Sequence, residues 1–333
     1  MMARYLGPAV MDAFADEDVT EVYLNAHDGR LRLNTRSRGK VETPHRLAAE
    51  RVEMFLNAAA AARQATLDRE RPQLAAELPL ERFGGARLQG FVPPVTAGPC
   101  FTARKRPGAV YSLDDYVARG LLAPAWRQAL RDAVRARENV LVVGGTDSGK
   151  TTLANAVLQD VADACPGDRV VVLEDAVELR CAAPDHVALR TAPEAAPPVS
   201  LRDLVKSALR TAPTRIVVGE VRDAAALDLL DAWATGHPGG VATLHATSVP
   251  GALLRLDRLA QRANVPPQAP LVAEAVQVVV VMRNAPADSQ AGAAGGPVAP
   301  ARRVIDLVRV AGLAPDGRYL LHRCSESGTW HPV

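Results

Sequence analysis

The stretch GGTDSGKTT, residues 144–152, decides the fold; the apolar run NVLVV precedes it and LANAVLQDVA follows it. It satisfies the spacing G-x-x-x-x-G-K-[ST] of a phosphate-binding loop, which lies between a strand and a helix. In such a loop the backbone N–H groups and the helix N-terminus point at the phosphates of a nucleotide. We therefore expect the loop residues to bind a nucleotide: Gly144, Gly145, Thr146, Asp147, Ser148, Gly149, Lys150, Thr151 and Thr152.

Three of these residues carry specific expectations. Lys150 would neutralise the β- and γ-phosphate oxygens, and the Thr151 hydroxyl would be a ligand of Mg²⁺. Asp147 is unexpected, because a carboxylate close to a triphosphate weakens binding unless it points to solvent. We expect its side chain to be turned outward. The alternative for the whole stretch is a strand–turn–helix whose glycines serve only the backbone.

Composition limits the class of protein. The chain has 333 residues, a length that favours two domains, and its 39 Lys and Arg nearly balance its 37 Asp and Glu. This balance gives no support for nucleic-acid binding, which usually needs a basic excess. Four cysteines without a C-x-x-C pair indicate neither zinc nor a disulfide scaffold. The longest apolar run, 276–282, is too short to span a membrane. Free thiols and acidic residues near the N-terminus predict a cytoplasmic protein, with peripheral membrane attachment left open.

The chain divides by pattern into a small α+β domain (1–106), a linker (107–122) and an α/β domain (123–333). In the first domain VTEVYLN and GRLRLN alternate as strands do, and Thr43-Pro44 predicts the start of a helix. The linker carries a short helix with Ser112 as N-cap.

Apolar runs alternate with helical patterns in the α/β domain: VLVV, VVVLE, RIVVGE, VATLH and VQVVVVM. Continuous apolar strands separated by helices predict a largely parallel sheet covered on both faces. Residues 285–300 are rich in Ala, Gly and Pro and predict a flexible surface loop.

Carboxylates follow two of these strands. Glu174 ends VVVLE, with Asp175 and Glu178 just beyond it, and Glu220 ends RIVVGE. Ligands bind at the carboxyl ends of parallel strands, so Glu174 could orient Mg²⁺ or a water; the alternative is a solvated acidic loop. Glu220 would contact Mg²⁺ through water or polarise the attacking water.

Two further elements carry candidate residues. In TGHPGGVATLHA, His237 and His245 flank a glycine turn and a strand and are candidates for sensing the γ-phosphate. Ser200 and Asp203 predict a helix start, and Arg202 and Arg210 follow as candidates for stabilising phosphoryl charge in a neighbouring subunit. The alternative for both arginines is an exposed helix surface.

Taken in order, these segments resemble the motifs of the type II/IV secretion traffic ATPases, and most closely the TrbB-like conjugal-transfer ATPases. The matching segments are GGTDSGKTTL, LEDAVEL, LRDLVKSALR, RIVVGEVRDAAALDLLDAW and TGHPGGVATLHA, and EVYLN, GARLQGFVPP and FTARK extend the likeness toward the N-terminus. The sequence departs from the pattern at Asp147 (usually Gly), Thr214 (usually acidic) and Ala234 (usually Asn).

The resemblance implies a RecA-like ATPase domain joined to the N-terminal domain, with ATP and Mg²⁺ as cofactors and Arg104 reaching the nucleotide. It also implies a homo-hexamer at the cytoplasmic face of the inner membrane, working with other inner-membrane components of a type IV secretion system. No sequence-specific nucleic-acid binding is expected. Two alternatives stay open: a type IV pilus or type II secretion motor, and a scaffold that binds ATP without hydrolysing it.

Overall fold

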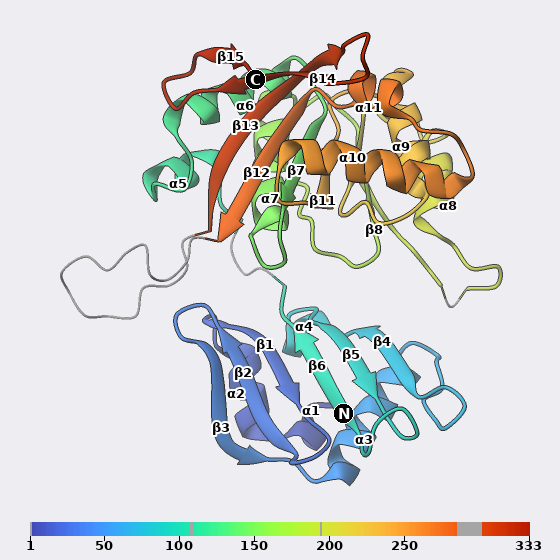
Figure 1. The fold of residues 1–333 in the computed structure, drawn as a ribbon. Helices are drawn as coiled ribbons and strands as arrows, with labels where there is room; N and C mark the ends of the chain where they lie inside the picture. Colours follow the sequence, from blue (N-terminus) through green and yellow to red (C-terminus); the bar gives the residue numbers. More distant parts are fainter. Residues whose placement is uncertain (1, 107–109, 194, 285–301) are drawn as a thin grey trace. The chain divides into compact units, whose positions relative to one another are not determined.

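The computed structural model describes residues 2–106, 110–193, 195–284 and 302–333. They form two compact units, residues 2–106 and the residues from 110 onward (Figure 1). The first unit runs from blue to cyan in the figure and the second from green to red. The expected insertion at 285–300 lies outside the described residues.

The first unit is a six-stranded antiparallel sheet in the order β3-β2-β1-β6-β5-β4, packed against helices. Its strands are β1 Val19–Leu24, β2 Arg30–Thr35, β3 Gly39–Arg46, β4 Gln73–Glu77, β5 Arg87–Phe91 and β6 Cys100–Arg104. Its helices are α1 Met2–Leu6, α2 Pro8–Ala15, α3 Ala49–Ala61 and α4 Leu80–Phe83. The α+β class and the strands expected at VTEVYLN and GRLRLN are confirmed.

The helix start expected at Thr43-Pro44 is wrong, because both residues lie in the edge strand β3 and the helix begins at Ala49. Proline is tolerated there because an edge strand has N–H groups without a ladder partner. The Thr43 hydroxyl donates to the carbonyl oxygen of Leu31 at 2.8 Å and so keeps β3 attached to β2.

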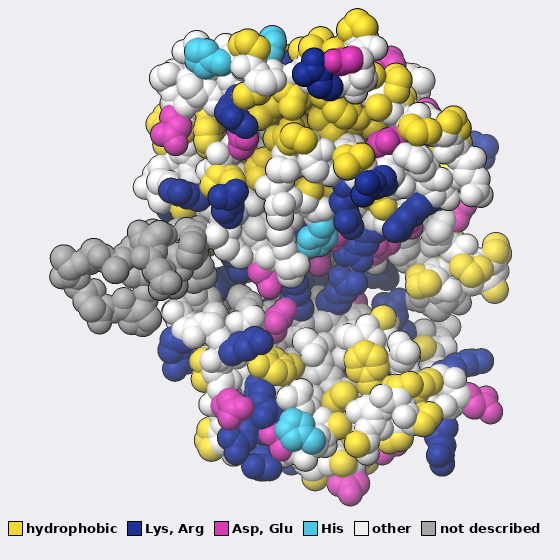
Figure 2. Space-filling view, in the orientation of Figure 1, with side chains coloured by type: hydrophobic (Ala, Val, Ile, Leu, Met, Phe, Trp, Pro, Cys, Tyr) yellow, Lys and Arg dark blue, Asp and Glu magenta, His cyan; other side chains and the backbone are white. Residues whose placement is uncertain are grey.

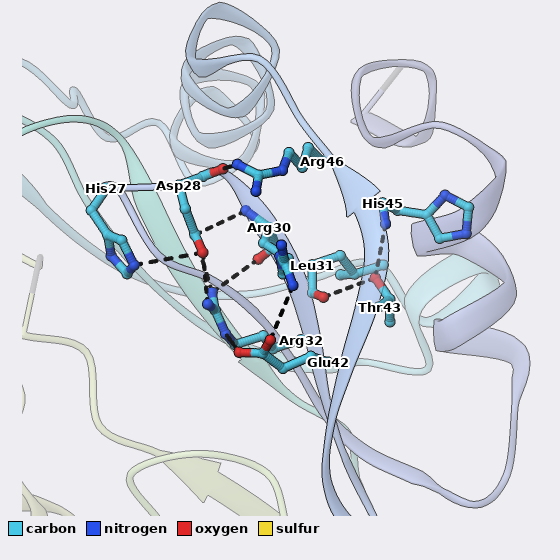
Figure 3. Close-up of polar contacts among 9 residues, drawn as sticks. All are labelled: His27, Asp28, Arg30, Leu31, Arg32, Glu42, Thr43, His45 and Arg46. Atoms are coloured by element: carbon cyan, nitrogen blue, oxygen red, sulfur yellow. Dashed lines mark hydrogen bonds and ion pairs between the residues drawn. The ribbon is translucent and has the colours of Figure 1, made fainter.

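Ionic contacts close the turn between β1 and β2 and tie β2 to β3 (Figure 3). Asp28 accepts from the Arg32 guanidinium at 2.6 Å and from the Arg30 N–H at 3.0 Å. Arg32 also donates to Glu42 at 3.0 Å, and Arg46 donates to the Asp28 carbonyl at 2.9 Å. The Arg32 hydrogen bond holds the pKa of Asp28 well below its usual range, so this carboxylate stays ionised. The contacts fix a hairpin whose open edge is polar.

The second unit is built on a nine-stranded sheet in the order β15-β14-β13-β12-β7-β11-β10-β8-β9. Its strands are β7 Val140–Gly144, β8 Val170–Glu174, β9 His186–Arg190, β10 Arg215–Val218, β11 Val241–His245, β12 Val278–Asn284, β13 Arg302–Leu313, β14 Tyr319–Cys324 and β15 Trp330–Pro332. The six strands from β12 to β9 are parallel, and β13 to β15 add an antiparallel end. The expected parallel strands are confirmed; β9 and the antiparallel end were not predicted.

Helices cover both faces of this sheet, as the continuous apolar strands predicted. They are α5 Leu113–Ala118, α6 Pro124–Arg135, α7 Lys150–Ala164, α8 Leu201–Ala208, α9 Ala225–Ala234, α10 Val249–Ala260, the 3₁₀ turn Gln261–Ala263 and α11 Ala269–Ala275. Successive residues of β7 show the division: Val140 and Val142 pack in the core with α5–α7, whereas Leu141 and Val143 pack in the core with α8–α11.

Two helix starts follow the sequence signals closely. Ser112 caps α5 and Ser200 caps α8, each through a reciprocal bond with the aspartate three residues on. α5 lies within the expected linker, and its Leu113 and Tyr116 are buried in the core of the second unit. In the described residues no helix is long and apolar enough to cross a membrane.

Candidate nucleotide-binding site

The phosphate loop, residues 144–151, joins the central strand β7 to α7, as expected from the sequence. Gly144 has no room for a side chain, since a Cβ there would lie 2.3 Å from the Ser148 hydroxyl and 2.7 Å from the Met282 carbonyl. Gly149 has φ +91°, a left-handed conformation that glycine adopts without strain, and it is the N-cap residue of α7. The Ser148 hydroxyl donates to the Gly145 carbonyl at 2.9 Å. The loop is therefore tightly folded, and Gly144 and Gly149 occupy positions that require glycine.

Asp147 also has a left-handed backbone, with φ 56°, and its side chain is exposed. Aspartate tolerates this conformation better than most residues, so it can occupy this position of the phosphate loop. The orientation of its side chain relative to a bound triphosphate stays a prediction. Thr146 is exposed as well, and Thr152 is partly buried at the start of α7.

Lys150 connects the phosphate loop to the neighbouring strand. It is only 7% exposed, and its Nζ donates to the Gly145 carbonyl at 2.8 Å. The same Nζ lies 3.3 Å from Nδ1 of His245, the last residue of β11. Burial, followed by the positive charge of Lys150, lowers the pKa of His245 below its usual 6.5. His245 is therefore neutral near pH 7.

Glu220 lies on the other side of the His245 ring from Lys150. Nε2 of His245 lies 3.0 Å from Oε1 of Glu220, and Arg222 donates to Oε2 of Glu220 at 2.5 Å. Burial would raise the pKa of Glu220, but the Arg222 hydrogen bond, together with the positive charges of Arg222 and Lys150, outweighs burial and lowers the pKa. Glu220 is thus an ionised carboxylate held at the carboxyl edge of the sheet.

The residues after β8 bring further oxygens toward the phosphate loop. Oε1 of the buried Glu174 accepts from the N–H groups of Glu178 at 2.9 Å and Leu179 at 2.8 Å. The Thr151 hydroxyl donates to Oε2 of Glu178 at 3.4 Å. Asp175 is exposed and accepts from the Thr191 hydroxyl at 3.2 Å, a contact that helps to order this loop. A part for these carboxylates in orienting Mg²⁺ or a water stays a prediction.

The chemistry of these side chains fits Mg²⁺, which prefers hydroxyl, carboxylate and water oxygens. Thr151 and Glu220, the two residues predicted to serve the metal, lie on the same edge of the sheet as Glu174. Among the described residues no group of three His, Cys, Asp or Glu could hold a metal alone.

The structure separates the two histidines of the TGHPGG segment. His245 is at the carboxyl end of β11, whereas Nδ1 of His237 lies 3.0 Å from the Pro213 carbonyl, before the start of β10. His237 therefore belongs to the opposite edge of the sheet and has no part in the candidate site. The two glycines after it are required by packing: a Cβ at Gly239 would lie 2.5 Å from the Arg215 guanidinium, and one at Gly240 would lie 2.2 Å from the indole nitrogen of Trp233.

The three predicted arginines lie outside the line from Lys150 to Glu220. Arg202 on α8 pairs with Asp228 at 2.6 Å, and Arg210 is exposed beyond the end of the same helix. Arg104 ends β6 in the first unit, with its Nε 3.9 Å from Glu21. Their roles toward a nucleotide stay predictions.

Sequence reasoning missed two residues that touch the site. Arg222 follows Glu220 by two positions, and its contact with that carboxylate could have been suspected from the GEVRD spacing. Asn155 lies on α7 four residues after Thr151 and is 2% exposed. A buried amide on a helix belongs to no motif, so the sequence carries no direct signal for it.

Comparison with known proteins identifies the family of the chain. The profile of the family described as type II/IV secretion system protein matches residues 1–305. The chain is 41% identical over 314 residues to a probable conjugal transfer protein TrbB of Sinorhizobium fredii, covering 94% of this chain and 90% of that one. It is 42% identical over 275 residues to the conjugal transfer protein TrbB of Rhizobium radiobacter, covering 83% and 82%.

A solved structure shares the fold. The crystal structure of the pilus retraction motor PilT with bound ADP aligns with a TM-score of 0.60 at 19% identity, covering 90% of this chain and 80% of that one. The RecA-like α/β class with a smaller N-terminal α+β unit is thereby confirmed. The matched profile and the two TrbB relatives are sufficient to show the family. The chain belongs to the type II/IV secretion system protein family, among the traffic ATPases of type IV secretion and conjugal transfer.

Proposed function

We propose that this protein hydrolyses ATP to power a type IV secretion or conjugal transfer apparatus, in assembly of the apparatus or its pilus and in transfer of substrate. The observation that carries the proposal is the line Lys150–His245–Glu220. It joins the phosphate-loop lysine to an ionised carboxylate at the carboxyl edge of a parallel sheet, where α/β proteins bind their ligands.

Each residue has a task in this proposal. Lys150 leaves the Gly145 carbonyl to neutralise phosphate oxygens, and the loop N–H groups bind the remaining oxygens. Thr151 would be the protein ligand of Mg²⁺ and Glu220 would act on it through water; the metal would supply neutralisation of phosphate charge. Glu220 also orients the attacking water, and Glu174 supports it from the adjacent strand. His245 reports the γ-phosphate, because it contacts both Lys150 and Glu220.

We also propose, from the resemblance to the traffic ATPases, that the working form is a homo-hexamer at the cytoplasmic face of the inner membrane, associated with other secretion components. In such a ring Arg202 or Arg210 would reach a neighbour's nucleotide. For Arg202 this requires exchange of its intramolecular partner Asp228. Arg104 would approach the nucleotide from the N-terminal unit.

A second candidate function is a scaffold that binds ATP for assembly and hydrolyses little. Asp147 favours it, because the carboxylate stands in the phosphate loop where the family usually has glycine. The ordered contacts of Lys150 and Glu220 favour hydrolysis instead.

Steady-state ATP hydrolysis separates the two. The native protein would be compared with Lys150→Ala, Glu220→Gln and the matched control Arg318→Ala, whose side chain is exposed. Light scattering would give the mass of each in the same buffer. We expect a Mg²⁺-dependent rate that both site variants reduce by roughly a hundredfold or more while the control retains it. If the native protein assembles and binds ATP, yet turns over no faster than Glu220→Gln, the motor proposal is wrong and the scaffold stands.

A further inference from the structure

The amide of Asn155 joins two parts of the candidate site. Asn155 and Thr151 are four residues apart on α7 and share one face of the helix. Nδ2 of Asn155 donates to the Glu178 carbonyl at 3.2 Å, and its Oδ1 accepts from the Arg180 N–H at 2.8 Å. One buried side chain therefore holds the main chain of the acidic loop, residues 175–180, at two points.

The same loop is fixed from the strand side. Oε1 of Glu174 accepts from the N–H groups of Glu178 and Leu179, and Leu179 is buried in the core. The Thr151 hydroxyl donates to the Glu178 carboxylate. Glu178 is thus held through its N–H, its carbonyl and its carboxylate, by residues of both β8 and α7.

We propose that Asn155 is a positioning residue that sets the Glu178 carboxylate against the Thr151 hydroxyl. The inference rests on the proposed function, in which Thr151 is the protein ligand of nucleotide-bound Mg²⁺. A carboxylate behind a metal-binding group fixes its orientation and basicity, and loss of such a partner costs about 10–100-fold in metal affinity or activity. Asparagine offers a donor and an acceptor together, which is what the two backbone contacts require.

A purely packing role for Asn155 makes a different prediction, so the variants are chosen to separate the two. Asn155→Leu fills a similar volume but forms neither hydrogen bond, and a packing role would tolerate it. Gln159→Ala is the matched control: Gln159 lies one turn further along α7 and bonds Asp163 instead of the acidic loop.

Hydrogen exchange at the Arg180 amide tests the contact without any nucleotide. We expect exchange to become faster by roughly tenfold or more in Asn155→Leu and to stay at the native rate in Gln159→Ala. Equal exchange in Asn155→Leu and the native protein would mean that Asn155 does not hold the acidic loop, and the proposal would be overturned.

Binding of ADP with Mg²⁺ and with excess EDTA tests the consequence. We expect Asn155→Leu to lose roughly tenfold or more of the affinity gained from Mg²⁺, while its affinity in EDTA stays within about twofold of native. An undiminished Mg²⁺ gain in Asn155→Leu overturns the positioning role and leaves the proposed function intact. A native protein that binds no ADP under either condition contradicts the proposed function itself, and the two failures are thereby distinguished.

Discussion

Nε2 of His245 lies 3.0 Å from Oε1 of Glu220. The ammonium of Lys150 can only donate, so Nδ1 of His245 accepts from it and the ring proton is on Nε2, where it donates to Glu220. This single tautomer lets one neutral ring contact a cation and an anion at once. It also makes the arrangement sensitive to pH.

The first prediction concerns that sensitivity. Because the pKa of His245 is lowered in the folded protein, the unfolded chain binds more protons as pH falls below 6.5, and the free energy of unfolding decreases. The lowered pKa of Glu220 acts only near and below 4.5, outside this range. Urea unfolding measured at about pH 7.5 and about pH 5.5 gives the free energy of unfolding at each pH. Between the two, that free energy should decrease less in His245→Asn than in the native protein. The exposed His331→Asn serves as control, and an equal loss in all three proteins would contradict the prediction.

The second prediction concerns Arg222. Its hydrogen bond is the largest influence that lowers the pKa of Glu220, so Arg222→Ala should raise that pKa. If Glu220 orients the attacking water, the acid limb of the kcat/KM profile should move to higher pH by roughly one unit. Arg222→Lys keeps the charge and should move it less. An acid limb at the native pH in Arg222→Ala would show that Arg222 does not tune this carboxylate.

Asp147 gives a third prediction. Its side chain is exposed, and a charge pair 4 Å apart in water is worth only about 1 kcal/mol. We therefore expect Asp147→Asn, which removes the charge, to bind ATP within about tenfold of native affinity. Asp147→Gly should behave similarly, since glycine also adopts the left-handed backbone found here. A gain of about a hundredfold in either variant would mean that the carboxylate faces the phosphates.

The glycines of the TGHPGG segment support a fourth prediction. A Cβ at Gly240 would lie 2.2 Å from Trp233 Nε1 and 2.3 Å from the Ile216 carbonyl, so Gly240→Ala should lower the free energy of unfolding by about 1–3 kcal/mol. Gly167→Ala is the matched control, because nothing lies within 4 Å of its Cβ. Equal urea midpoints for the two variants would refute the packing argument.

The buried ion pair Arg215–Asp168 supports a fifth prediction, which concerns stability. Arg215 is fully buried, and its Nε donates to Asp168 at 2.6 Å. Arg215→Met leaves the half-exposed Arg137, which donates to the other oxygen of Asp168 at 2.5 Å, as the remaining cation beside this buried carboxylate. The loss of the buried Arg215 partner should cost about 1–3 kcal/mol of unfolding free energy. Adding Asp168→Asn should restore part of the loss. Urea unfolding of the single and double variants measures both effects, and a double variant no more stable than the single one would count against an electrostatic origin.

The sequence predicted the parts of the site that are local. The phosphate loop is set by a short run of residues, so its strand, glycines and lysine could be placed correctly. Glu220 and His245 could be brought together because parallel strands end at one edge of a sheet. His237 was misjudged because eight residues separate it from His245, enough to place it beyond the other end of β11.

Other features depend on tertiary contacts that no local pattern records. Thr43-Pro44 has the chemistry of a helix start, but a position on a sheet edge overrides it. Arg215 looks like any polar residue at the start of a strand, and its burial follows from three carbonyl and carboxylate partners far away in sequence. The burial of Asn155 also depends on distant contacts, because the residues that it bonds, Glu178 and Arg180, follow β8 and not its own helix.

The position of β7 in the centre of the sheet has a consequence for synthesis of the chain on the ribosome. Its two neighbours, β11 and β12, are encoded about 100 and 140 residues later, so the strand before the phosphate loop has no partner until most of the protein has been made. The first unit uses only residues before 107 for its described sheet and can form much earlier. We therefore expect a nascent chain stopped near residue 240 to carry a folded N-terminal unit and an incomplete, chaperone-dependent nucleotide-binding unit.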